Sequence, residues 1–136
     1  MAIIDKRRES AMLTSPANVI GATLKCRTAV IFDDMISTGG TVIGAARVAQ
    51  DHGANRVLVC ATHGVLVGQA IVRFMEAFEQ EYIEEVIITD TIPLLPEKQL
   101  PQIRVVTVSK LLADAIKRIH RNESVSYLFR SYHVEK

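Results

Sequence analysis

Short apolar runs rich in valine and isoleucine recur along the chain, separated by segments with helical periodicity. A strand inside a parallel sheet is covered on both faces and reads as a continuous apolar run, whereas a half-exposed antiparallel strand alternates with polar residues. Five runs have the continuous form: MAII at 1–4, TAVIF at 28–32, RVLVCA at 56–61, EEVIIT at 84–89 and IRVVTV at 103–108. We expect each of them to form a parallel strand.

Helical periods fill three of the gaps between these runs. They read GTVIGAARVAQDHGA from Gly40, GQAIVRFMEAFEQEYI from Gly68 and SKLLADAIKRIHR from Ser109. Gly53 supplies a C-terminal stop for the first helix, and Ser109 is a candidate N-cap for the third. The alternation predicts an α/β fold, with a doubly wound, mostly parallel sheet flanked by helices and right-handed crossovers.

Three segments depart from this alternation. NVIGATLKCRTAVIF reads as two strands joined around Lys25 and Cys26, which predicts a short antiparallel excursion at about 18–32. The segments at 5–17 and 89–102 contain charged residues, Ser, Thr and Pro without a regular period. Both are therefore expected to be loops.

Length and composition limit the class of protein. A chain of 136 residues with 49% hydrophobic content has the size of one domain, so we expect a single globular domain over 1–136. No apolar run is long enough to span a bilayer, and the start of the chain is charged by Asp5. We therefore expect a cytoplasmic protein with no membrane partner. A net charge of +1 and an aromatic content of 5% argue against nucleic acid as a partner.

The two cysteines, Cys26 and Cys60, are far apart in the sequence, and Cys60 lies inside an apolar run. This context predicts buried, reduced thiols. Neither the spacing of the cysteines nor His52 and His63 complete a zinc-binding pattern. No structural metal is expected.

The segment IFDDMISTGGTVIGAA at 31–46 joins two adjacent acids to a turn rich in glycine and hydroxyl groups. Ligands of open α/β sheets bind beyond the carboxyl ends of the strands, where Asp33 and Asp34 and the start of the helix after Gly40 are expected. An anion there meets backbone N–H groups and the positive end of the helix dipole. The candidate phosphate-binding residues are Ser37, Thr38, Gly39, Gly40 and Thr41.

The acids suit a different part of the same ligand. Ionised carboxylates accept hydrogen bonds and repel phosphate, so Asp33 and Asp34 suit two neighbouring sugar hydroxyls. A phosphate at one end and a diol at the other describe ribose 5-phosphate, and the acids would stabilise positive charge developing at the anomeric carbon. Walker and dinucleotide-binding motifs do not fit the glycine spacing. The alternative is a simple turn with a Ser or Thr N-cap and two solvated acids.

Polar residues also follow other strands. Lys6, Arg7 and Arg8 come after the first apolar run, at what is expected to be the same sheet edge. They suit a transferring diphosphate, or they form a solvated strand end. His63 in ATHG and the sequence TDT at 89–91 follow two further strands. His63 is either a ligand or acid–base group, or a structural turn residue.

Several of these motifs together resemble one enzyme family. IIDKRR, VIFDDMISTGGT, ATHG, TDTIP and the closing LLADAIKRIH and ESVSYLF look like the carboxyl-terminal half of ribose-phosphate pyrophosphokinase, the PRPP synthetase, which has a phosphoribosyltransferase-type fold. The resemblance implies that Asp33 and Asp34 bind the ribose hydroxyls and that the turn at 37–41 binds the phosphate. It also implies that Lys6 and Arg8 are basic catalytic residues of a flexible loop.

The resemblance further implies a reaction and its partners. Family members transfer diphosphate from Mg-ATP to the anomeric hydroxyl of ribose 5-phosphate, which gives PRPP and AMP, and they assemble as oligomers. Mg²⁺ would accompany ATP or PRPP, with no identifiable ligand in this chain. We expect the chain to bind ribose 5-phosphate or PRPP, and to form a homo-oligomer or associate with a full-length synthetase.

One part of the family pattern is not found in this sequence. The amino-terminal half of family members carries ATP-binding residues and an acidic, glycine-containing loop for the diphosphate, and neither pattern occurs here. We therefore expect ATP to be used only where a second half is supplied, whether the chain is a fragment, a truncated product or a half-length relative. The alternatives are a non-catalytic regulatory or associated subunit that binds sugar phosphate, and a small phosphoribosyltransferase.

Overall fold

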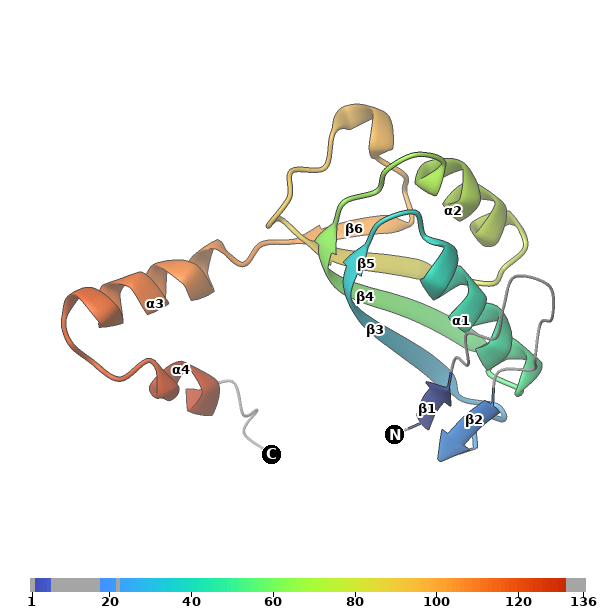
Figure 1. The fold of residues 1–136 in the computed structure, drawn as a ribbon, viewed down its shortest axis with the longest axis horizontal. Coiled ribbons are helices and arrows are strands. Elements are labelled where there is room, and N and C mark those ends of the chain that lie inside the picture. The colour runs from blue at the N-terminus through green and yellow to red at the C-terminus, as the bar shows by residue number, and fades with distance from the viewer. Residues whose placement is uncertain (1, 6–17, 22, 132–136) are drawn as a thin grey trace.

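A four-stranded parallel sheet forms the centre of the computed structural model, which describes residues 2–5, 18–21 and 23–131 (Figure 1). Its strands follow one another in the sheet in chain order, and each pairs in parallel with the next. They are β3 (Thr28–Ile36), β4 (Arg56–Gly64), β5 (Glu85–Thr89) and β6 (Ile103–Val106). The α/β fold expected from the sequence, with parallel strands flanked by helices, is confirmed.

Two helices cover one face of this sheet: α1 (Gly40–Asp51) between β3 and β4, and α2 (Ala70–Glu79) between β4 and β5 (Figure 1). The core lies between these helices and the sheet. Its largest fully buried side chains are Phe74, Ile36, Leu66, Ile83, Ile88, Val42, Val57, Val59 and Val86. On the other face, Val30 and Phe32 of β3 are exposed.

The first helix ends where the sequence predicts. Gly53 follows the last turn of α1 with a φ of 91°, a left-handed conformation that glycine adopts without strain. Its N–H donates to the carbonyl of Gln50 at 2.7 Å. The third helix begins differently from the expectation, because Val108 is the N-cap of α3 (Ser109–His120) and Ser109 is the first helical residue. The N–H of Ser109 donates to the hydroxyl of Thr107 at 3.2 Å.

The amino-terminal strands depart from the prediction. β1 (Ala2–Asp5) and β2 (Asn18–Gly21) pair antiparallel in a separate two-stranded sheet, near the amino-terminal end of β3 (Figure 1). The first apolar run is therefore not a strand of the parallel sheet, and β1 does not end at that sheet's carboxyl edge. Within the described residues, β2 does not pair with β3, so the antiparallel excursion expected at 18–32 is not found there.

The turn before β3 is bonded to the end of α1. Cys26 has a φ of 58°, and its N–H donates to the carbonyl of Gly53 at 2.8 Å. Asn55 closes the same corner by donating its N–H to the carbonyl of Arg27 at 3.0 Å. These bonds tie the turn to the end of α1. They also place the Cys26 thiol at the surface, and Cys60 is only partly buried; both thiols are free, but the expectation of burial is wrong.

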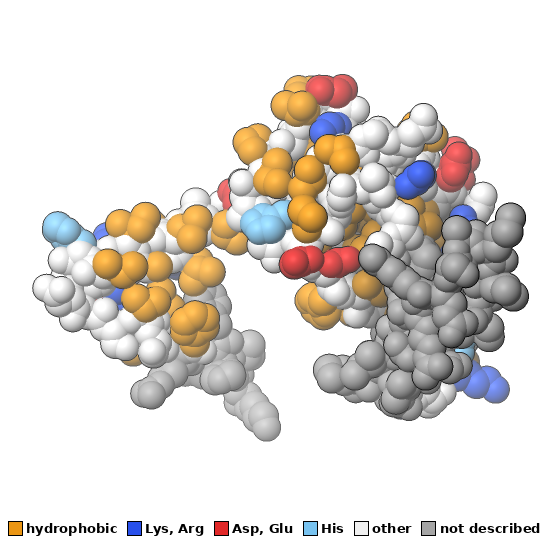
Figure 2. Space-filling model, in the orientation of Figure 1, with side chains coloured by type: hydrophobic (Ala, Val, Ile, Leu, Met, Phe, Trp, Pro, Cys, Tyr) orange, Lys and Arg blue, Asp and Glu red, His pale blue; other side chains and the backbone are white. Residues whose placement is uncertain are grey.

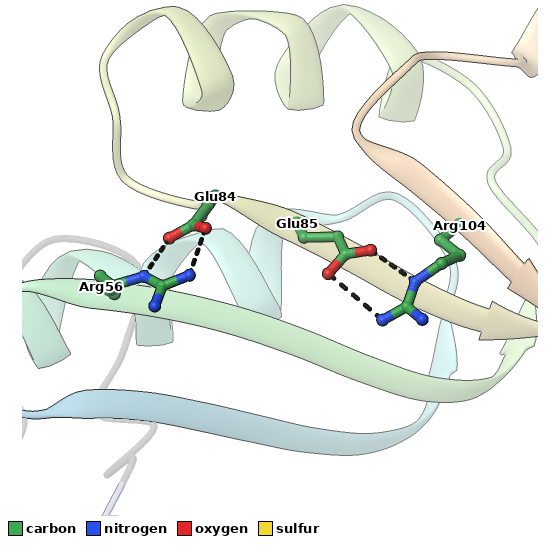
Figure 3. Close-up of polar contacts among 4 residues, drawn as sticks. All are labelled: Arg56, Glu84, Glu85 and Arg104. Atoms are coloured by element: carbon green, nitrogen blue, oxygen red, sulfur yellow. Dashed lines mark hydrogen bonds and ion pairs between the residues drawn. The ribbon is translucent and has the colours of Figure 1, made fainter.

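Two exposed ion pairs join neighbouring strands (Figure 3). The Arg56 Nε donates to Glu84 at 2.6 Å, and the Arg104 Nε donates to Glu85 at 2.6 Å. The hydrogen bond from Arg56 lowers the pKa of Glu84. Exposed pairs of this kind add little stability. We therefore expect them to contribute little to the pairing of β4, β5 and β6.

The last two helices, α3 and α4 (Ser126–Ser131), extend away from the sheet (Figure 1). No residue of α3 is buried, and its exposed apolar side chains include Leu112, Ile116 and Ile119. Figure 2 shows apolar side chains gathered over this part of the molecule. The guanidinium of Arg118 links the two helices, since it lies 4.3 Å from the ring centroid of Tyr127.

The loop at 89–102 contains one short 3-10 helix, η1 (Pro96–Lys98), and is otherwise irregular, as expected. Over the ranges that the structure describes, the helices are all too short or too polar to cross a bilayer.

The backbone at Gly64 lies close to a core side chain, which gives a test of the packing. A Cβ added at Gly64 would lie 2.5 Å from Cδ1 of the fully buried Ile88. We expect Gly64→Ala to lower the free energy of unfolding by about 1–3 kcal/mol, as overpacked cores do, measured by urea denaturation.

Gly44→Ala is the matched control, because a Cβ there meets nothing within 4 Å. Gly44 lies inside α1, where alanine is favoured over glycine by about 0.5–1 kcal/mol. If both variants shifted stability in the same direction and by the same amount, the packing of Gly64 against Ile88 would be contradicted.

Candidate functional site

The acid pair lies at the carboxyl end of β3, next to the start of α1. Asp33 pairs in register with Ala61 of β4, and its side chain is partly buried, whereas that of Asp34 is exposed. The Asp34 N–H donates to Oδ1 of Asp33 at 2.9 Å. This bond orients the first carboxylate while its other lone pairs stay available to a donor. The structure thus brings the acids and the glycine-rich turn to one edge of the sheet, as predicted.

The turn between β3 and α1 depends on Gly39. This residue is the N-cap of α1 with a φ of 78°, and its carbonyl accepts the first helical hydrogen bond, from Ile43 at 3.0 Å. A Cβ at Gly39 would be strained by that φ and would lie 3.1 Å from the ring of the buried Phe74. No side chain caps the helix, so the alternative of a Ser or Thr N-cap is wrong. The N–H groups of a first helical turn have no intrahelical partner and are suited to an anion.

Neighbouring segments hold this turn by its carbonyl groups. Leu66 donates its N–H to the carbonyl of Ile36 at 3.1 Å, and Val67 donates to that of Ser37 at 3.0 Å. From α2, Nη1 of Arg73 donates to the carbonyl of Thr38 at 3.2 Å. The turn is therefore supported on its carbonyl side by the loop that follows β4 and by α2.

Arg73 was missed by sequence reasoning. Its guanidinium carries a positive charge to the turn, and Nη1 lies 3.6 Å from where a Cβ of Gly40 would be. A guanidinium beside a glycine-rich turn favours a bound phosphate. Arg73 sits inside a regular helical period, 35 residues from Thr38 in the sequence, so no local pattern indicates the contact.

Polar residues at the ends of β4 and β5 form a second group at the same edge. His63 pairs in register with Met35, which follows the acid pair in β3. The His63 Nδ1 lies 2.8 Å from the hydroxyl of Thr91, and the Thr89 hydroxyl donates to the Thr62 carbonyl at 2.7 Å. Sequence reasoning named His63 and the TDT motif separately, and the structure joins them.

Asp90, in the middle of TDT, faces the last strand. The N–H of Val108 donates to its Oδ1 at 2.9 Å. The pKa of Asp90 is lowered by a hydrogen bond from the side chain of Thr107 and by the bond from Val108. The carboxylate thus fastens the loop at 89–91 to the segment that leads into α3.

Other predicted site residues lie beyond what the structure describes. Lys6, Arg7 and Arg8 are outside the described residues, and their catalytic role stays a prediction. Across the described ranges, no group of three or more His, Cys, Asp or Glu side chains could hold a metal ion. The expected Mg²⁺, which would accompany ATP or PRPP, therefore stays a prediction.

The fold and this edge define an α/β domain with a glycine-capped helix start and an adjoining acid pair. Its sequence matches the family model of the phosphoribosyl synthetase-associated domain over residues 7–130. The chain belongs to this family.

Relatives with longer chains carry the same stretch. The chain is 46% identical over 130 residues to a ribose-phosphate pyrophosphokinase of Rhodopirellula baltica, covering 96% of this chain and 40% of the relative. It is 50% identical over 129 residues to the ribose-phosphate pyrophosphokinase of Caldanaerobacter subterraneus subsp. tengcongensis, covering 95% of this chain and 39% of that one. It thus spans about two fifths of the length of the curated relatives it matches.

A solved structure has the same fold. The crystal structure of phosphoribosylpyrophosphate synthetase from Mycobacterium smegmatis superposes with a TM-score of 0.74 at 37% sequence identity. The match covers 89% of this chain and 37% of that chain. The family relation and the fold therefore agree with the resemblance seen in the motifs.

The low pKa of Asp90 predicts how the site edge responds to acid. A carboxyl whose folded pKa lies below its unfolded value stabilises the fold above the unfolded pKa, and this stability is lost as the pH falls through the folded pKa. We expect Thr107→Val to raise the pKa of Asp90, because it removes the hydroxyl whose hydrogen bond stabilises the ionised carboxylate most. An NMR titration of the side-chain carboxyl carbon would measure it.

Thr28→Val is the control, since Thr28 lies at the opposite end of the sheet, at the start of β3. An unchanged titration of Asp90 in Thr107→Val would contradict the role given to the Thr107 hydroxyl.

Proposed function

We propose that this chain is the ribose 5-phosphate-binding portion of a ribose-phosphate diphosphokinase and corresponds to the carboxyl-terminal half of the longer enzymes. The observation that carries the proposal is the position of two chemically different groups at one sheet edge. The Gly39-capped turn offers N–H groups to a phosphate, and Asp33 and Asp34 offer acceptors to a diol. A ribose 5-phosphate has both functions, one at each end.

The charge arrangement supports one orientation of the ligand. Phosphate is repelled by the carboxylates and attracted by the helix start and the Arg73 guanidinium. The phosphate therefore lies over the turn at 37–41, with the vicinal hydroxyls over the acids. Free phosphate would contact only the turn at 37–41, and a neutral sugar would contact only the acids.

In the complete reaction, Mg-ATP donates a diphosphoryl group to the anomeric hydroxyl, and AMP leaves. The residues of this chain bind and orient the sugar, and the acids stabilise positive charge near the anomeric carbon. Lys6 and Arg8 would neutralise the transferring diphosphate, with Mg²⁺ supplied on the nucleotide. The ATP-binding residues come from a second half, so the chain is incomplete on its own.

Association with another polypeptide follows from this incompleteness. The exposed apolar side chains of α3, including Leu112, Ile116 and Ile119, favour either a homo-oligomer or a complex with a full-length synthetase. A regulatory or associated subunit that binds sugar phosphate without catalysis is the second candidate function, and it rests on the same surface. A small phosphoribosyltransferase would need a hood for its base, and nothing in the described residues favours one.

Ribose 5-phosphate binding tests the site directly. We expect the chain to bind ribose 5-phosphate, and Asp33→Asn with Asp34→Asn to weaken the affinity by about tenfold or more. Hydrogen bonds to charged groups contribute about 1.5–3 kcal/mol each, and about 1.4 kcal/mol is tenfold in affinity. Isothermal titration calorimetry gives the dissociation constants.

Asp51→Asn at the far end of α1 is the matched control and is expected to leave the affinity unchanged. Inorganic phosphate should compete for the site in both the unmodified chain and the double variant, because the turn is intact in each. Equal ribose 5-phosphate affinity in the unmodified chain and the double variant would remove the diol contact from the proposal.

The need for a second half has its own test. We expect the chain alone, given ribose 5-phosphate and Mg-ATP, to release no AMP above the level seen without the sugar phosphate, because it lacks the ATP-binding residues. AMP is measured by chromatography, with a full-length synthetase as the positive control. Robust AMP release that depends on ribose 5-phosphate would show that this chain is a complete enzyme.

A further inference from the structure

The group of polar side chains at the ends of β4 and β5 contains more hydrogen-bonding contacts than hydroxyl protons. The Thr89 and Thr91 hydroxyls each reach the carbonyl of Thr62, at 2.7 and 3.0 Å. The two hydroxyls also lie 2.9 Å from each other. The fourth contact joins the Thr91 hydroxyl to Nδ1 of His63 at 2.8 Å.

Counting protons assigns the tautomer of His63. Each threonine hydroxyl has one proton, so the two hydroxyls can satisfy only two of the four contacts. A third contact is satisfied only if Nδ1 of His63 carries a proton and donates it to Thr91. The arrangement with the most hydrogen bonds is therefore the one in which His63 donates through Nδ1. In the neutral ring, Nε2 is then an acceptor.

The backbone fixes the place of this acceptor. The Thr91 N–H donates to the Thr89 hydroxyl at 3.2 Å. This bond holds the loop that carries the Thr91 hydroxyl next to His63. His63 is exposed, and its register partner Met35 directly follows the acid pair. Neighbouring strands are about 4.8 Å apart, which puts the imidazole within reach of a small ligand held by Asp33 and Asp34. Among the described residues, nothing bonds Nε2.

We propose that Nε2 of His63 accepts a hydrogen bond from the anomeric hydroxyl of bound ribose 5-phosphate, and that Thr91 positions the imidazole for this contact. The inference rests on the proposed function. The turn takes the phosphate and the acids take the two vicinal hydroxyls, so the anomeric hydroxyl is the one donor of the sugar left without a partner. An acceptor is required there, and a neutral one avoids a third negative charge at the edge.

A pair of ligands isolates this contact. One is ribose 5-phosphate, and the other is its analogue with hydrogen in place of the anomeric hydroxyl. We expect His63→Ala to weaken ribose 5-phosphate binding about fivefold, the size of one neutral hydrogen bond, and to leave analogue binding unchanged. The readout is the dissociation constant of the full chain from calorimetry. His52→Ala is the control, because His52 also bonds through Nδ1, to the carbonyl of Val48 at 2.8 Å, but at the far end of α1.

The positioning role of Thr91 has a separate readout. The ring nitrogen shifts of His63, measured by heteronuclear NMR on the ligand-free chain, are expected to show the tautomer protonated at Nδ1. Thr91→Val removes the acceptor hydroxyl and should mix the tautomers and weaken ribose 5-phosphate binding, whereas Thr91→Ser should restore both. A purely structural role for Thr91 would not move the tautomer.

The outcomes separate this inference from the function on which it rests. If the chain binds ribose 5-phosphate and loses affinity in the acid variants but not in His63→Ala, the inference is overturned and the proposed function stands. Equal losses for the two ligands in His63→Ala would overturn the anomeric contact. A ring protonated at Nε2 in the unmodified chain would overturn the positioning by Thr91. If the unmodified chain binds no ribose 5-phosphate, both fail together.

Discussion

The left-handed backbone at Gly39 is the constraint on which the site depends. β3 ends at Ile36, and the positive φ at Gly39 turns the chain into α1, so that the first N–H groups of the helix face the carboxyl edge of the sheet. The ring of Phe74, the largest fully buried side chain, packs under the same glycine. The core and the glycine-rich turn proposed to bind phosphate therefore meet at one residue. A change that adds a side chain there strains the turn and pushes on the core together.

Around this turn, the negative carboxylates and the hydrogen-bond-donating N–H groups lie on different short segments of backbone. The carboxylates belong to the end of β3, and the N–H groups belong to the start of α1. Arg73 reaches the turn from α2 and bonds the carbonyl of Thr38, so its charge lies on the side of the turn. A ligand with a phosphate and a diol has only one orientation that avoids repulsion. Under the proposed function, the specificity of the site comes from the separate placement of its phosphate-binding and diol-binding groups.

Some features of the fold could not be predicted from the sequence. Continuous apolar runs predicted β3, β4, β5 and β6 because a parallel strand is apolar throughout. The same reasoning failed for β1, which has an apolar run but pairs antiparallel in a separate sheet. This pairing joins distant residues such as Ala2 and Gly21, and a hydropathy pattern does not show it. The prediction of Ser109 as an N-cap was wrong for a local reason: Val108 is the N-cap of α3, and the Ser109 N–H donates to the Thr107 hydroxyl.

The sequence by itself determined the α/β fold, the acid pair and the glycine-rich turn, because these features are local: periodicity, adjacency and the conformational freedom of glycine act over a few residues. Only the tertiary structure decided that Arg73 supports the turn and that Thr91 orients His63. These contacts join residues 35 and 28 positions apart, and they exist because parallel strands bring their carboxyl ends to one edge. The pattern of a helix or strand does not indicate which distant residue a side chain contacts, because that contact depends on the register of the sheet.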